Sequence, residues 1–109
     1  MITQEQLQDR FVYINGTLIY RYSFGKRKVG SSAGYMKSDG YWRVYIHGKG
    51  YYLHRLIWLY HKGTNPTLEL DHINRNKSDN RIENLREVTH KDNQSWMIGK
   101  LLYDHKRRF

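Results

Sequence analysis

Short apolar runs separated by turn residues mark the N-terminal part of the chain. Phe11–Ile14 and Thr17–Tyr20 are rich in aromatic and β-branched residues, and Asn15-Gly16 lies between them. Both turn residues tolerate positive φ, so this arrangement predicts a two-residue β-hairpin. Residues 1–10 are polar and partly acidic, and they predict a lead-in with no more than a helical turn.

Apolar and polar side chains alternate over residues 41–47, which is the period of a half-buried strand. Glycines on either side supply turns toward shorter strands at residues 34–36 and 51–53. Residues 25–34 carry three basic side chains and no apolar periodicity. They therefore predict a flexible basic loop between the two groups of strands.

Helical spacing of apolar residues appears over residues 54–62, and Gly63 follows where a helix usually ends. Residues 68–73 then predict a strand, and the polar residues 74–80 predict a loop. A second short strand is expected at residues 86–88.

A last helix is expected from Thr89 to about residue 98, because Thr89 and Asp92 have the spacing of a capping box. The fold class is therefore α+β, with N-terminal β-hairpins ahead of a strand, loop, strand and helix.

Charge changes this picture toward a nucleic-acid partner. The chain of 109 residues has 19 Lys and Arg against 10 Asp and Glu, a formal net charge of +9. Such an excess on a small domain is typical of proteins that bind a phosphate backbone. A basic protein that merely stays soluble is the alternative.

The chain has no cysteine, which excludes disulfides and thiolate zinc sites. Its polar N-terminus does not resemble a signal peptide, and its longest apolar run, residues 56–60, is too short to span a bilayer. We therefore expect a soluble cytoplasmic protein without a membrane partner, in the host cytoplasm if a phage encodes it.

Four polar residues of the C-terminal half carry chemistry. Asp71 and His72 lie at the end of the strand expected at residues 68–73, Asn84 lies twelve positions after His72, and Asn93 falls in the first turn of the last helix. Carboxylate and amide oxygens suit Mg²⁺ or Mn²⁺. A histidine can take a proton from water near neutral pH.

This region resembles the phage-type HNH endonucleases, which include intron-encoded homing enzymes. The resemblance is carried by Asp71-His72-Ile73-Asn74, by Asp79-Asn80-Arg81-Ile82-Glu83-Asn84-Leu85-Arg86 and by Asn93, and it extends over residues 34–95. It implies a ββα-metal fold and a metal-dependent endonuclease that hydrolyses DNA phosphodiester bonds.

The resemblance also implies roles for these residues. His72 matches the general base, and Asp71 matches a ligand of one divalent cation, Mg²⁺ or Mn²⁺. Asn84 matches the middle asparagine, which braces the loop and orients the histidine. Asn93 matches the third position, and His90 is the alternative ligand there.

Three segments are expected on this basis: an N-terminal hairpin and basic loop at residues 1–33 that grips DNA, a nuclease core at residues 34–99, and a basic tail at residues 100–109. Basic side chains in the first two segments are candidates for phosphate contacts: Lys26, Arg27, Lys28, Arg43, Arg75, Lys77, Arg81 and Arg86.

Two other functions are compatible with the sequence. One is a nucleic-acid-binding protein that keeps the HNH fold without cleavage, and the other is a nuclease that acts on RNA. For a DNA nuclease, the alternatives are a chain that nicks one strand or a homodimer that cuts both. Either could work alone or beside phage packaging or replication proteins.

Overall fold

The computed structural model describes residues 1–89. Asn93, His90, the tail at residues 100–109 and the predicted helix beyond Thr89 lie outside these residues. Within the described part, no helix is long and apolar enough to cross a membrane.

The N-terminal elements are helix α1 (Gln4–Arg10) and the antiparallel hairpin of β1 (Phe11–Ile14) and β2 (Thr17–Tyr20). The hairpin predicted from Asn15-Gly16 is confirmed, and both turn residues have positive φ. Helix α1 is longer than expected, because Thr3 and Gln6 form a capping box that fixes its start.

The central elements are a three-stranded antiparallel sheet and helix α2 (Leu53–Lys62), which follows the sheet directly. The sheet has the order β3 (Tyr35–Met36), β4 (Trp42–Ile46) and β5 (Lys49–Tyr52). Gly63 ends α2 in the left-handed conformation with φ 83°, as its position after the apolar pattern predicts.

The C-terminal hairpin consists of β6 (Glu69–His72) and β7 (Leu85–Val88). The loop between them ends in a 3₁₀ turn, η1 (Ile82–Asn84). The register places Asp71 opposite Arg86 and His72 opposite Leu85. Both strands were predicted, β6 one residue too long at each end and β7 one residue too short.

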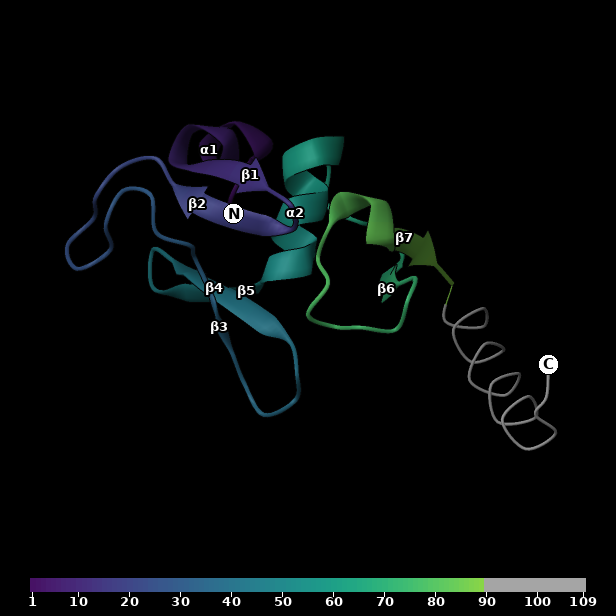
Figure 1. Ribbon diagram of the computed structural model, residues 1–109. Helices are drawn as coiled ribbons and strands as arrows, with labels where there is room; N and C mark the ends of the chain where they lie inside the picture. The colour runs from purple at the N-terminus through teal and green to yellow at the C-terminus, as the bar shows by residue number, and fades with distance from the viewer. Residues whose placement is uncertain (90–109) are drawn as a thin grey trace, which may run out of the picture.

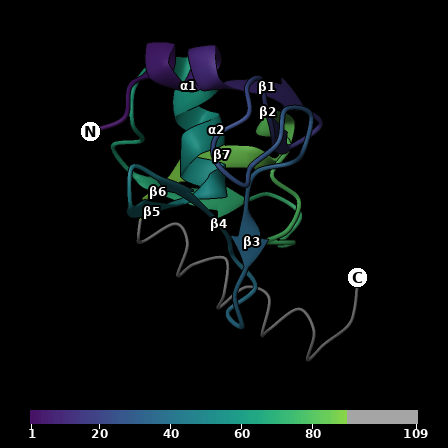
Figure 2. The same cartoon turned by 90° about the vertical axis from the view of Figure 1, so that its left-hand side faces the viewer.

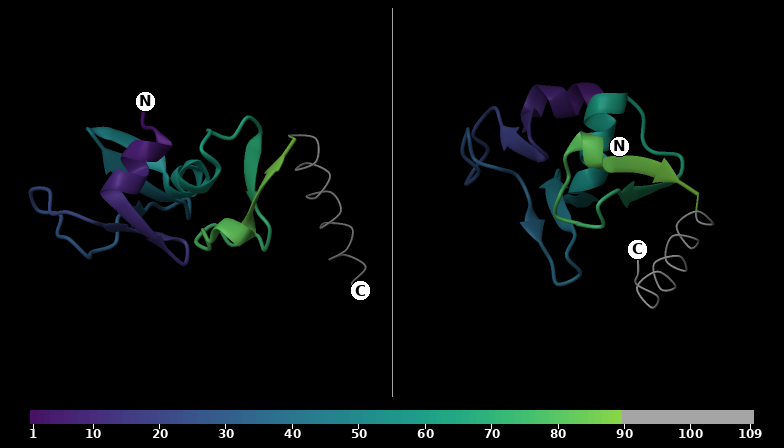
Figure 3. Two further views of the ribbon diagram at one scale, coloured as in Figure 1. Left: turned by 90° about the horizontal axis from the view of Figure 1, so that it is seen from above. Right: turned by 45° about the vertical axis from the view of Figure 1, so that its right-hand side comes forward.

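Helix α2 lies at the centre of the described fold and contacts α1, β4, β5 and η1. In Figures 1 and 2, α1 crosses one end of α2, and Figure 3 shows α2 between the N-terminal elements and the β6–β7 hairpin. The largest fully buried side chains come from α1, β1, β2, β4 and α2: Leu7, Phe11, Leu18, Val44 and Ile57. The helix α1 and the β1–β2 hairpin therefore share one apolar core with the central sheet and helix.

The N-terminal hairpin also contacts the loop that precedes η1. The Tyr13 hydroxyl accepts a hydrogen bond of 3.0 Å from the backbone N–H of Ile82. At the hairpin turn, a Cβ added to Gly16 would lie 2.7 Å from the backbone nitrogen of Arg81. The turn and the loop are thus in backbone contact, and only glycine fits at this point.

Replacing Gly16 by alanine should lower the free energy of unfolding by about 2 kcal/mol more than replacing Gly48 does. Both glycines have positive φ, 84° and 74°, so alanine should cause similar backbone strain at the two positions. A Cβ added to Gly48, however, would meet no atom within 4 Å. Urea unfolding of the two variants measures the difference. Equal losses would mean that the turn does not press on the loop.

Candidate active site

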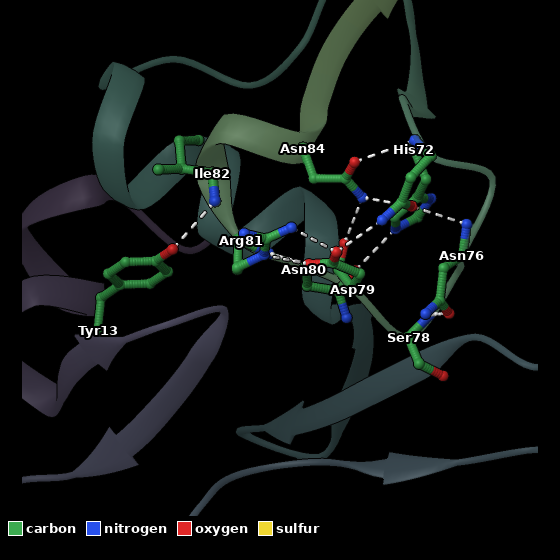
Figure 4. A network of polar contacts seen from close by, with 10 residues as sticks. Tyr13, His72, Asn76, Ser78, Asp79, Asn80, Arg81, Ile82 and Asn84 are labelled. Atoms are coloured by element: carbon green, nitrogen blue, oxygen red, sulfur yellow. Dashed lines mark hydrogen bonds and ion pairs between the residues drawn. The ribbon is translucent and has the colours of Figure 1, made fainter.

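His72 ends strand β6 with a buried imidazole, 5% exposed. Its Nε2 lies 2.7 Å from Oδ1 of Asn80, which is also buried (Figure 4). A carboxamide oxygen can only accept, so Nε2 must carry the proton. In the neutral ring this leaves a lone pair on Nδ1. The arrangement fixes which nitrogen of His72 can act as a base.

Asn80 was predicted only as a loop residue, and the contact with the histidine was assigned to Asn84 through the resemblance. In the structure, Asn84 makes the bonds that brace the loop, and the contact with the imidazole lies with Asn80. The ring of His72 is bonded to Asn80, whereas Asn84 bonds to the loop. The sequence of residues 79–86 contains both asparagines, but nothing in it distinguishes which one contacts the histidine.

Asn84 closes the loop between β6 and β7. Its Nδ2 donates to Oδ1 of Asn74 at 3.0 Å and to the backbone carbonyl of Asp79 at 2.8 Å, and its Oδ1 accepts from the Asn74 N–H at 3.0 Å. The backbone carbonyl of Asn84 accepts from Ile73 at 2.8 Å. These bonds join the two ends of the loop and hold Asn80 beneath the histidine.

Polar side chains within the loop satisfy its turns, as Figure 4 shows. The Asn74 carboxamide oxygen accepts from the Asn76 N–H, and that of Asn76 accepts from the Ser78 N–H. Such Asx turns are the usual reason for asparagine in a loop. The loop conformation is therefore largely encoded by its own residues.

Asp71 directly precedes His72 in β6 and lies opposite Arg86 in the hairpin. It is buried, and its two carboxylate oxygens accept from two arginines: Oδ1 from Arg75, and Oδ2 from Nε of Arg86 at 3.0 Å. Burial lowers the pKa of the Arg75 guanidinium, an effect that the charge of Asp71 partly offsets. Asp71 is thus the centre of a compact group with two positive charges around one negative charge.

As a metal ligand, Asp71 supplies a hard oxygen donor. Within residues 1–89, no group of three or more His, Cys, Asp or Glu side chains could hold a metal ion. One carboxylate fits the way Mg²⁺ is usually bound, with one or two carboxylates and with phosphate and water oxygens as further ligands. The second predicted ligand, Asn93 or its alternative His90, lies outside the described residues.

An aromatic group covers the imidazole of His72. The ring of His54 lies 5.0 Å from that of His72, and the ring of Tyr41 lies 6.3 Å from it. His54 belongs to the first turn of α2 and is itself buried, and the N-cap of that helix is Tyr52. Burial, together with the charges of His72 and Arg55, lowers the pKa of His54 to about 3. His54 is therefore neutral at physiological pH.

Acid should destabilise the protein through His54. The unfolded chain protonates this residue near pH 6.5, but the folded protein does so only near pH 3, so the folded state loses stability as the pH falls through this interval. Between pH 6.5 and 5 the expected loss is about 1.5 kcal/mol. Urea unfolding of the wild type and His54→Gln at both pH values measures it. The same pH dependence in the variant would contradict the assignment.

The basic residues proposed to contact phosphates fall into two groups. Four of them are ion-paired: Arg75 and Arg86 with Asp71, Arg43 with Asp39 and Arg81 with Asp79. Hydrogen bonds from Arg43 lower the pKa of Asp39 to about 2, and those from Arg81 likewise lower the pKa of Asp79.

The remaining four basic residues differ in their surroundings. Lys77 donates to the backbone carbonyl of Asp39 and lies over the ring of Tyr41. Lys26, Arg27 and Lys28 are exposed on the connection between β2 and β3, which projects from the fold in Figure 1. Its tip is a tight turn, in which Phe24 and Arg27 exchange two backbone hydrogen bonds of 2.7 Å.

Comparison with known proteins places the site in a recognised segment. Residues 51–95 match the family model described as HNH endonuclease. This segment contains α2, the β6–β7 hairpin and the positions of His90 and Asn93. No curated protein matches the chain.

Among solved structures, the chain is similar to one described as "DNA binding and cleavage by the HNH homing endonuclease I-HmuI". The TM-score is 0.59 and the sequence identity 28%, over 79% of this chain and 49% of the other. The chain therefore spans about half the length of that endonuclease. The likeness extends beyond residues 51–95, because 79% of the chain is a larger share than that segment.

Proposed function

We propose that the chain, whose residues 51–95 match the HNH endonuclease family, is a divalent-metal-dependent enzyme that hydrolyses phosphodiester bonds of DNA. The observation that carries the proposal is the hydrogen bond between Nε2 of His72 and Asn80. His72 lies in the segment that matches the family, and it directly follows Asp71 in the chain. The fold likeness to an endonuclease described as binding and cleaving DNA supports DNA as the substrate.

In the proposed reaction, His72 is the general base. Its Nδ1 accepts a proton from the attacking water, and the hydrogen bond from Nε2 to Asn80 stabilises the imidazolium that forms. The loop braced by Asn84 keeps Asn80 in place during this transfer. The ring of His54 cannot compete for the proton, since its pKa is about 3.

Asp71 and, outside the described residues, Asn93 or His90 would hold the divalent cation. When bound, such a cation polarises the phosphoryl oxygen and stabilises the leaving 3′ oxygen. Carboxylate and amide oxygens favour Mg²⁺ or Mn²⁺, whereas a histidine at the third position would favour softer ions.

Positive charge supports the assignment of DNA as the partner. The formal net charge is +9, and the exposed Lys26, Arg27 and Lys28 project from the fold. Contacts of this kind bind the phosphate backbone and set the position of the protein rather than read the sequence.

Supercoiled plasmid tests the proposal directly. Incubation with Mg²⁺ or Mn²⁺ should produce nicked or linear DNA, and EDTA should prevent it. A structured RNA of similar length, assayed in parallel, shows which nucleic acid is preferred. Intact plasmid under all metal conditions, or equal cleavage in EDTA, would contradict a metal-dependent DNA endonuclease.

A further inference from the structure

Two arginines form ion pairs with Asp71, the carboxylate that the proposed function assigns to metal binding. Oδ1 of Asp71 accepts from Arg75 and Oδ2 accepts from Arg86 at 3.0 Å. The side chain of Asp71 is 8% exposed, while those of Arg75 and Arg86 are 22% and 48% exposed. The carboxylate of Asp71 is thus more buried than the side chain of either arginine.

The backbone at Arg75 is strained in a way that favours this contact. Arg75 has φ 65°, a left-handed conformation that glycine adopts far more easily than a long side chain. Its N–H donates to the carbonyl of His72 at 2.8 Å, which closes the turn directly after β6. This turn carries the guanidinium back over Asp71. Strained residues of this kind cluster at functional sites.

We propose that Arg75 and Arg86 compete with the divalent cation for Asp71, and that a guanidinium displaced by the cation moves to a DNA phosphate. The inference rests on the proposed function, because it assumes that Asp71 binds the metal. A cation bound to Asp71 takes up lone pairs of the carboxylate and repels the two guanidinium groups, so it weakens the hydrogen bonds that they make there. A guanidinium binds phosphate oxygens with the same two-pronged geometry that it uses for carboxylates.

The proposal has two measurable consequences. Removing a competing arginine tightens metal binding, because the cation no longer displaces a charge-assisted hydrogen bond. Metal binding also strengthens DNA binding, because it releases an arginine to the phosphate. By linkage, the two binding reactions are then coupled to the same extent in both directions.

Calorimetric titration of the full chain with Mn²⁺ tests the first consequence. Arg75→Gly removes the guanidinium and suits the left-handed backbone, and Arg86→Gln removes the other from an exposed position. Arg81→Gln is the matched control, since it removes a guanidinium from the same hairpin that is paired with Asp79. Circular dichroism and thermal unfolding establish that each variant is folded.

Mn²⁺ should bind Arg75→Gly about tenfold more tightly than the wild type, from the usual strength of hydrogen bonds to charged groups. Arg86→Gln should show a smaller gain, because Arg86 is more exposed, and Arg81→Gln should resemble the wild type. Unchanged Mn²⁺ affinity in both Arg75→Gly and Arg86→Gln, or an equal gain in Arg81→Gln, would overturn the competition.

DNA binding at saturating Mn²⁺ and in EDTA tests the second consequence, with His72→Ala as the background to prevent cleavage. Mn²⁺ should strengthen DNA binding more when Arg75 is present than in the Arg75→Gly double variant. An equal gain in both would overturn the coupling. If the wild type cleaves plasmid but the arginine variants bind Mn²⁺ no more tightly than it does, this inference alone is refuted. If the arginine variants bind Mn²⁺ more tightly but the wild type does not cleave plasmid, the proposed function is refuted.

Discussion

Replacement of His72 by alanine is expected to lower the rate of DNA cleavage by about 10²- to 10⁴-fold, the usual contribution of a general base. The variant loses the Nδ1 lone pair that accepts the proton from water, while the basic side chains on the protein surface are unchanged. DNA affinity should therefore change little. Single-turnover cleavage with saturating Mn²⁺ measures the chemical step, and a gel-shift assay measures binding.

His61→Ala is the matched control for this experiment. His61 is an exposed histidine at the end of α2, where its Nδ1 contacts the carbonyl of Ile57. It should cleave DNA at the wild-type rate. If His72→Ala retained full activity, another group would have to be the base, and the mechanism proposed for this site would be wrong.

Replacement of Asn80 by alanine should lower the cleavage rate by roughly 100-fold, the upper end of what partners that orient functional histidines contribute. Without the Oδ1 acceptor, Nε2 of His72 loses its 2.7 Å hydrogen bond, so neither the ring orientation nor the tautomer is fixed. Single-turnover rates again report the effect.

The Asn80→Asp variant separates the loss of the hydrogen bond that orients His72 from the loss of packing around residue 80. Aspartate keeps an oxygen acceptor at the same position and has a similar volume. It should retain more activity than Asn80→Ala. Thermal unfolding of both variants shows how much of the effect is a loss of stability. A wild-type rate in folded Asn80→Ala would mean that the bond does not position the histidine.

Local signals predicted much of the fold. Asn15-Gly16 between apolar runs identified the first hairpin, and Gly63 identified the end of α2, because turn and cap residues determine the backbone within a few positions. The capping box of Thr3 and Gln6 was an equally local signal for α1 that the polar composition of residues 1–10 obscured.

The sequence predicted which segment holds the candidate site, but not which of its asparagines contacts His72. Asn74, Asn76, Asn80 and Asn84 lie within one loop and offer identical donors and acceptors, so the sequence alone does not reveal which one meets the histidine. In the structure Asn80 makes that contact, whereas Asn84 bonds to Asn74 and to the backbone of Asp79. The choice between Asn93 and His90 as the third metal position stays a prediction.

Long-range contacts were beyond the sequence for a related reason. Arg75 and Arg86 were predicted to bind phosphates, yet both contact Asp71 in the structure. That contact requires the register of β6 with β7 and the left-handed turn at Arg75, neither of which follows from the residue types. The backbone contact between Gly16 and Arg81 likewise depends on how distant segments pack.

The tautomer of His72 can be observed without any reaction. Nuclear magnetic resonance of the ¹⁵N-labelled protein at neutral pH distinguishes a protonated ring nitrogen from one with a lone pair. If Asn80 fixes the ring as the hydrogen bond indicates, Nε2 carries the proton and Nδ1 does not, and the Asn80→Ala variant loses this preference. A proton found on Nδ1 in the wild type would contradict the assignment of that nitrogen as the base.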